Sequence, residues 1–312
     1  MINVNDSLEK KLRDYLQLYW LRPENALLTT FKSKAIEDYS FSSPALDISC
    51  GDGLFMFLHL GGKFEFNFDY FKNTSAKEFS HEQFIDIYDS FDESYNVPIE
   101  QTPNFSFDYG TDWKQSLLDK SQKLSLFKNL IKHDNNIKPF PLPDNYFKII
   151  HSNSIYWIEN PETLLSEIYR MLDEDGIAIL EVMTPQHFST FDKLSPFLSK
   201  EALEILDRKR RKTMPGLKNY QDWKKIIENQ NFKIHEVKNI YPNRFVIDVW
   251  NIGLRPISHL LIQMSEAIST NDRTRIKKEW VDIFFELFKP LLYLDIDYSF
   301  EESPYLLFVL KK

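Results

Sequence analysis

The sequence predicts an α/β protein built on a doubly wound sheet, and two observations lead to this fold class. Between residues 105 and 183, short apolar stretches typical of strands alternate with amphipathic stretches typical of helices. Upstream, at 45–60, an apolar stretch runs into a glycine turn with a helical stretch behind it. Strands separated by helices pair in parallel through right-handed crossovers, so we expect helices on both faces of a sheet.

The N-terminal 40 residues are expected to form a helical extension. Apolar side chains between Leu8 and Tyr19 recur every three or four residues, which is the spacing of an amphipathic helix. The first strand is then expected at Ala45–Ile48 and the helix behind the turn at Leu54–Leu60.

The core of the fold is expected at 41–185. Its further strands are expected at 105–111, 126–132, 147–152 and 176–183, and its further helices at 113–124 and 161–172. Pro161 supports the last of these helices, because proline is favoured in a first turn. Residues 61–104 carry many acidic, amide and aromatic residues without this alternation. We interpret them as an insertion over the sheet edge or the site.

The remaining region, 186–312, is expected to be largely helical. Helices are expected at 199–211, 221–229 and 273–288, and strands at 233–237 and 305–310. A last strand after so long a helical excursion is expected to close the sheet as an antiparallel neighbour.

Composition and charge narrow the classes of function. The chain of 312 residues has 38 Lys and Arg against 46 Asp and Glu, a formal net charge of −8, which disfavours a nucleic-acid partner. Its one cysteine, Cys50, excludes a disulfide framework and a multi-thiolate metal site, and we expect no metal.

The basic run at 208–212 is interpreted as a solvated helix face, with a ligand role as the alternative. We find no signal-peptide core at the N-terminus and no run suited to span a bilayer, so we expect a cytoplasmic protein.

The turn at 47–53, Asp-Ile-Ser-Cys-Gly-Asp-Gly, is the first candidate ligand site. Open α/β sheets bind ligands beyond the carboxyl ends of their strands, and glycine lets a backbone approach a ligand closely. The dinucleotide pattern G-x-G-x-x-G would need glycines at 49, 51 and 54, whereas the chain has Ser49, Gly51 and Leu54. A phosphate-binding loop of the G-x-x-x-x-G-K type is also absent.

Four segments together resemble the motifs of class I S-adenosylmethionine-dependent methyltransferases. Residues 46–53 resemble the first motif, and 139–147, 152–158 and 167–176 resemble the later motifs in the same order. The resemblance covers 44–185 without the insertion. It implies a seven-stranded, mostly parallel Rossmann-like sheet with an antiparallel last strand. It also implies S-adenosyl-L-methionine as cofactor and S-adenosyl-L-homocysteine as product.

The resemblance implies roles for the first turn and for the carboxylate that holds the ribose. Asp47, Gly51 and Gly53 match the loop at the methionine end of the cofactor. Ser49 replaces the first glycine of the motif, which is tolerable if its backbone angles are ordinary. Asp112 follows a strand where the family holds the ribose hydroxyls. Asp69 is the rival, because it ends a strand candidate at 64–69 and lies 22 residues after Asp47; we favour Asp112, since the alternation continues after it.

Other candidate cofactor residues follow later strands. Asp134 matches the acidic residue beside the adenine amine, with Asn135 next to it, although both are also typical of ordinary loops. Ser152 and Asn153 end the strand that borders the reaction centre. Trp113, like Tyr156 on the substrate side, either flanks the ligand or belongs to the core.

The implied chemistry is in-line displacement, in which a nucleophile of the acceptor attacks the sulfonium methyl group. An oxygen nucleophile needs a proton acceptor, and His187 is the candidate base. Arg22 and Arg255, each followed by proline, are candidates for a substrate carboxylate or phosphate, with a structural ion pair as the alternative. We expect methyl transfer to a small-molecule or glycan acceptor, with 61–104 and 186–300 as lid and pocket. The alternatives are a non-catalytic binding protein with this fold and a protein-directed methyltransferase.

Overall fold

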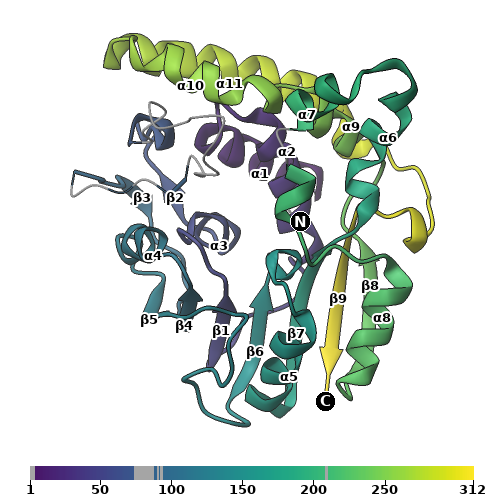
Figure 1. The fold of residues 1–312 in the computed structure, drawn as a ribbon. Helices are drawn as coiled ribbons and strands as arrows, with labels where there is room; N and C mark the ends of the chain where they lie inside the picture. Colours follow the sequence, from purple (N-terminus) through teal and green to yellow (C-terminus); the bar gives the residue numbers. More distant parts are fainter. Residues whose placement is uncertain (1–3, 74–87, 90, 92–93, 208–209) are drawn as a thin grey trace.

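A seven-stranded sheet forms the centre of the molecule (Figure 1). The computed structural model describes residues 4–73, 88–89, 91, 94–207 and 210–312. The strands, in their order across the sheet, are β5 (Phe127–Lys132), β4 (Phe107–Asp112), β1 (Ala45–Ile48), β6 (Phe147–Ser152), β7 (Leu172–Met183), β9 (Tyr305–Lys311) and β8 (Lys233–Asn239). The first five are parallel, and β9 runs antiparallel to both of its neighbours. This arrangement confirms the predicted fold class.

Helices cover both faces of the sheet, which divides the buried apolar residues into two clusters. One face packs against α1 (Val4–Leu18), α2 (Pro23–Ala35) and α3 (Leu54–His59). The other packs against α5 (Pro161–Met171) and α8 (Tyr220–Asn229), while α4 (Gln115–Gln122) lies along β4 and β5. Strand β1 lies between both clusters and is buried throughout, as expected of a central parallel strand.

Helix α2 was not predicted as a separate element. The expected N-terminal helix ends at Leu18, and Pro23 starts a second helix in its first turn. Nine of the 13 residues of α2 are buried, among them Thr29, Thr30 and Ser33. Because this helix is buried on most sides, its sequence shows no single apolar stripe.

Five helices lie at the end of the sheet where the parallel strands finish (Figure 1). They are α6 (Ser189–Leu194), α7 (Lys200–Asp207), α9 (Phe245–Ile252), α10 (Ser258–Glu266) and α11 (Thr270–Tyr293). The expected helix at 199–211 is shorter than predicted, because Arg210–Thr213 form a 3-10 turn.

One stretch bears on the expectation that no run is suited to span a bilayer. By length and composition alone, Phe245–Glu266 is long and apolar enough to cross a membrane. The structure divides it into α9, a 3-10 turn (Arg255–Ile257) and α10. Val246, Trp250 and Ile262 of this stretch lie in the core, which gives its apolar composition a structural explanation.

The insertion contributes a small sheet of its own. Strands β2 (Lys63–Phe64) and β3 (Ile99–Gln101) pair antiparallel outside the main sheet. The expected strand at 64–69 is therefore wrong, because only Phe64 of it is in a strand and a 3-10 turn (Tyr70–Asn73) follows. Residues 74–87, 90 and 92–93 of the insertion lie outside the described residues.

Candidate functional site

The turn between β1 and α3 has an unusual backbone. Ser49, Gly51 and Gly53 all have positive φ angles, of 57°, 58° and 76°. The backbone angles of Ser49 are therefore not ordinary, which was the condition for tolerating serine in place of the first glycine, and a serine there costs roughly 1 kcal/mol relative to glycine. The amide of Asn135 donates to the Ser49 hydroxyl at 2.5 Å, which fixes the serine side chain against the loop after β5.

Asp112 ends β4 directly beside this turn. Its Oδ2 accepts from the backbone N–H of Gly51 at 3.1 Å, and its Oδ1 accepts from that of Lys114 at 2.9 Å. Burial raises the pKa of Asp112, and the two backbone hydrogen bonds oppose this rise. The carboxylate is thus held at the switch point of the sheet, where strand order reverses between β1 and its two neighbours.

The rival carboxylate, Asp69, lies elsewhere. It accepts from the indole N–H of Trp20 at 3.0 Å and from Nε of Arg273 on α11 at 2.7 Å. Of the two candidates, the structure brings only Asp112 to the turn.

A shallow, open hollow of about 640 Å³ lies beyond Asp112, at the ends of β4 and β5. Trp113, with 61% of its surface exposed, lines it together with His133 and Asp134. Lys114 forms an ion pair with Asp89 of the insertion at 2.6 Å, so the insertion borders this hollow. An aromatic ring and a carboxylate around an open space beside Asp112 suit a nucleoside.

Further polar groups at the strand ends remain available for a ligand. The Asn135 Oδ1 and Ser152 Oγ atoms are buried and make no hydrogen bond with any described residue. A side chain at Gly51 would find open space within 4 Å. Asn153, after β6, is half-buried, and its carbonyl accepts from the Tyr305 hydroxyl at 3.4 Å. These groups fit the nucleoside and amino-acid parts of the cofactor that the sequence resemblance implies.

Four ionisable residues, of which Asp47, His151 and Glu181 are buried, form a line beneath the turn. Asp47 Oδ1 lies 2.7 Å from His151 Nδ1, and His151 Nε2 lies 3.7 Å from Glu181 Oε1. Glu181 Oε2 in turn lies 3.2 Å from Lys32 Nζ of α2. The sequence analysis missed Lys32 and Glu181. A glutamate inside the apolar strand Gly176–Met183 was the signal that could have drawn attention to them.

His187 lies in the 3-10 turn after β7 and is fully buried. Its ring packs against the rings of Trp250 at 4.5 Å and Phe188 at 5.1 Å, and neither ring nitrogen makes a hydrogen bond with a described residue. Burial lowers the pKa of His187 well below its usual value, and the charges of Arg210, Arg255 and Lys32 lower it further. The imidazole is therefore neutral at pH 7.

The two arginines that precede prolines are engaged with protein groups. Arg22 Nε donates to Glu24 at 3.2 Å, and its NH1 donates to the Tyr88 hydroxyl at 3.1 Å. Arg255 is buried, donates to the Asp207 carbonyl at 2.9 Å and stacks on Trp250. Tyr156 is also buried, with its ring edge-on to Tyr305. Arg22 is thus in an ion pair with Glu24, as the structural alternative expects, whereas Arg255 contacts a backbone carbonyl and an aromatic ring.

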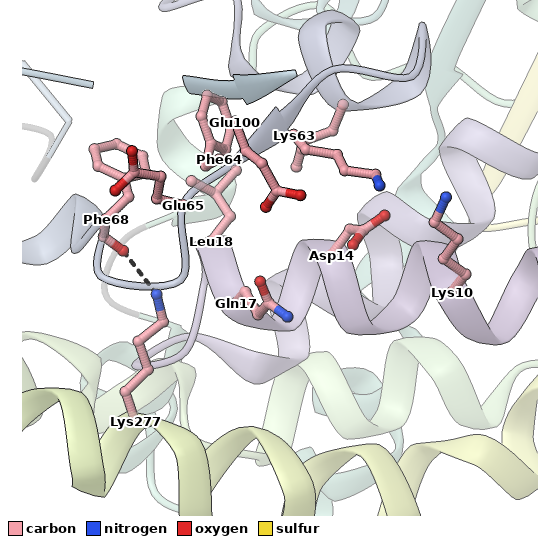
Figure 2. A pocket seen from close by; sticks show the side chains of 11 residues that line it. Lys10, Asp14, Gln17, Leu18, Lys63, Phe64, Glu65, Phe68, Glu100 and Lys277 are labelled. Carbon is pink, nitrogen blue, oxygen red and sulfur yellow. Dashed lines mark hydrogen bonds between the residues drawn. The ribbon is translucent and has the colours of Figure 1, made fainter. Parts of the chain in front are cut away.

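A second hollow, of about 210 Å³, lies between α1, α11 and the two-stranded sheet of β2 and β3 (Figure 2). Figure 2 shows the carboxylates of Asp14 and Glu100 pointing into it, beside Lys10 and Lys63, while Lys277 donates to the Phe68 carbonyl at 2.7 Å. Its lining residues come from none of the main-sheet strands. This hollow is therefore separate from the turn and Asp112.

Asp14→Asn should stabilise the protein at pH 7.5. Burial raises the pKa of Asp14 to about 6, although Lys10 and Lys63 oppose the rise. Because the folded pKa exceeds the unfolded one, this carboxyl favours folding only at low pH, and that contribution is lost as pH rises from about 4 through 6. In urea denaturation, we expect the free energy of unfolding of the variant to exceed that of the unaltered protein by roughly 1–2 kcal/mol at pH 7.5, and to equal it at pH 4. The expected gain is reduced because Asp14 is partly exposed. An equal gain at both pH values would contradict this account.

Comparisons with known proteins give a match to one family model and several distant structural similarities. Residues 102–180 match the family model for the methyltransferase domain, while no curated protein matches the chain. Among solved structures, a methyltransferase of Thermotoga maritima that depends on S-adenosylmethionine is 12% identical, with 92% of each chain covered and a TM-score of 0.47. A TehB-like methyltransferase of Corynebacterium glutamicum is also 12% identical, over 90% of this chain and 87% of that one, with a TM-score of 0.41.

A third solved structure, the [4+2]-cyclase SpnF, is 11% identical, over 91% of this chain and 80% of that one, with a TM-score of 0.48. These structural similarities are too distant to carry an argument about activity. The assignment of the chain to a family therefore rests on the domain match, together with the strand order of the sheet and the turn between β1 and α3.

Proposed function

We propose that this chain, which is a class I methyltransferase dependent on S-adenosylmethionine, methylates a small-molecule or glycan acceptor. The observation that supports the cofactor site most directly is the convergence of Asp112, the glycine turn and the hollow beside Trp113 at the switch point of the sheet.

Each part of the cofactor has candidate partners in this proposal. Asp112 would accept hydrogen bonds from the ribose hydroxyls, because an ionised carboxylate can accept from two donors at once. Trp113 would flank the adenine, and Asp134 would accept from its amine. The methionine part would be held by the turn and its neighbours, which are Asp47, Ser49, Gly51, Gly53, Asn135, Ser152 and Asn153.

The acceptor is proposed to be small, or to be the end of a longer chain such as a glycan. His187, Tyr156 and Tyr305 gather near the ends of β6 and β7, with ring centres 5.6 Å apart for the two tyrosines and 6.5 Å apart for His187 and Tyr305. All three are buried beneath the helices at this end of the sheet. A folded protein surface would not reach them, which is why we favour a small acceptor over protein methylation.

His187 is the proposed base for an oxygen acceptor. The bound cofactor supplies a methyl group already activated on a sulfonium, so the protein mainly has to orient the acceptor. A neutral imidazole can take the proton that the acceptor oxygen loses, and the ring nitrogens of His187 have no other described partner. Arg22 and Arg255 would then shape the pocket wall through their protein contacts, with direct binding of an acidic acceptor as the alternative.

Calorimetry with S-adenosylmethionine and S-adenosylhomocysteine tests the cofactor part of the proposal. We expect both to bind with micromolar affinity, and binding of neither would contradict an enzyme and favour a protein that keeps only the fold. The acceptor class is tested by incubating the protein and methyl-labelled cofactor with cell extract. Label in the low-mass or glycan fraction supports the proposal, whereas label in the protein fraction favours a protein substrate.

His187→Gln should lower turnover about 100-fold, since general-base catalysis contributes roughly 10²–10⁴-fold. Cofactor affinity should change less than twofold. Steady-state rates with the identified acceptor check the first expectation, and calorimetry with S-adenosylhomocysteine checks the second. Unchanged turnover in a folded variant would rule His187 out as the base.

A further inference from the structure

We propose that His151, Glu181 and Lys32 are positioning residues that hold the Asp47 carboxylate ionised and oriented toward the amino-acid part of the cofactor. This inference rests on the proposed cofactor site. It concerns residues that lie behind the turn and that the sequence analysis did not assign to cofactor binding.

The four residues form one continuous line of alternating charge. They come from four elements, β1, β6, β7 and α2, and the side chains of Asp47, His151 and Glu181 are at most 4% exposed. The 2.7 Å contact between Asp47 and His151 is a hydrogen bond. The 3.7 Å and 3.2 Å contacts of Glu181 are ion pairs. Lys32 also lies 3.5 Å from the Tyr305 hydroxyl, which anchors the far end of the line.

Charge balance requires a proton on His151. Two buried carboxylates face this ring from opposite sides, and Lys32 alone would compensate only one of them. Burial disfavours the charged ring, but Asp47 and Glu181 outweigh it and raise the pKa of His151 to about 9. Burial likewise raises the pKa of Asp47, and the imidazolium opposes that rise.

The other groups around the ring do not change this balance. Phe41 and Phe55 pack against it at 6.2 Å. His59 also faces it, but burial lowers the pKa of His59 to about 3, so that ring is neutral. Lys11 lies one step further away and donates to Ser33, which contacts His59.

Asp47 is the member of the line that reaches the strand end. Its Oδ1 is used by His151, and its Oδ2 makes no hydrogen bond with a described residue. An ionised carboxylate with one free oxygen at the end of β1 suits an ammonium group, since charge-assisted hydrogen bonds are the stronger ones. In the cofactor, only the methionine part carries an ammonium. The four residues are therefore expected to affect the binding of the methionine part and not that of the adenosine.

The test compares two ligands that differ in this part. S-adenosylhomocysteine carries the ammonium, whereas 5′-methylthioadenosine lacks the amino-acid group. For Glu181→Gln, calorimetry should show about tenfold weaker binding of S-adenosylhomocysteine and less than a twofold change for 5′-methylthioadenosine. Equal weakening of both ligands would indicate a merely structural role and overturn the proposal, as would no change in either.

A second variant protects the test against misfolding. The double variant Glu181→Gln and Lys32→Met removes one negative and one positive charge. It should again bind S-adenosylhomocysteine more weakly, with little change in the affinity for 5′-methylthioadenosine. Asp108→Asn is the matched control, because it removes a carboxylate that is 8% exposed at the start of β4, where it bonds Ser43 and Ala45. It should change neither affinity. If the unaltered protein binds neither ligand, the proposed function fails; if it binds both and the variants do too, only this inference fails.

An NMR titration of the His151 ring gives an independent readout. The midpoint should lie near 9 in the unaltered protein and roughly one unit lower in Glu181→Gln, because a neutral amide replaces one of the two facing carboxylates. An unchanged midpoint would contradict the coupling between Glu181 and His151.

Discussion

Asp112→Asn should weaken binding of S-adenosylhomocysteine by about 10- to 100-fold. A hydrogen bond to a charged group contributes roughly 1.5–3 kcal/mol, and the substitution replaces one acceptor oxygen by an NH2 group, which only donates. The substitution also weakens the hydrogen bonds that hold Asp112 beside the turn, because its carboxylate accepts from the backbone N–H groups of Gly51 and Lys114. Calorimetry measures the affinity, and circular dichroism verifies the fold.

Asp69→Asn is the matched control for this expectation. Asp69 is the carboxylate that the sequence offered as the alternative, and it pairs with Arg273 and Trp20. We expect that variant to lose stability, by about 1–3 kcal/mol, because a partly buried ion pair is broken, while cofactor affinity changes little. Loss of affinity in Asp69→Asn with none in Asp112→Asn would reverse the assignment.

The sequence was sufficient to predict the sheet because its signals are local. Strands β1 and β6 are short stretches rich in apolar residues that end in a turn, so they were predicted with the bounds that the structure has. The strand candidate at 64–69 failed for the same reason. Phe64 and Phe68 alternate with polar residues as in a strand, but in the structure both pack into the core around a turn.

What the sequence could not predict depends on contacts between distant segments. The left-handed angle of Ser49 is held by the turn and by Asn135, 86 residues away. The partners of Arg22 include Tyr88 in the insertion, and the line from Asp47 to Lys32 joins four separate elements. No periodicity marks such pairs, since each member by itself is one polar residue in an apolar stretch. The turn was recognisable as a candidate ligand site, whereas the charges behind it were not.

Gly53→Ala should destabilise the protein by about 2–4 kcal/mol. A left-handed backbone costs an alanine roughly 1 kcal/mol, and forcing a methyl group into a packed site costs roughly 1–3 kcal/mol more. At Gly53, with φ at +76°, a Cβ atom would stand 2.8 Å from the Ser121 hydroxyl and 3.1–3.2 Å from Leu124 and Phe127. The last two contacts are with packed side chains, so relief requires a shift of α3 away from β5.

Gly51→Ala separates the stability of this turn from its proposed function. Gly51 also has a positive φ, at +58°, but a Cβ there meets nothing within 4 Å, so the loss of stability should stay near 1 kcal/mol. That open space is where we propose that the cofactor passes the turn, so this variant should lose at least tenfold in affinity for S-adenosylhomocysteine. We therefore expect the two measurements to rank the variants in opposite order. Urea denaturation should show Gly53→Ala as the less stable variant, and calorimetry should show Gly51→Ala as the weaker binder. If Gly51→Ala binds as tightly as the unaltered protein, the ligand does not approach the backbone at this turn.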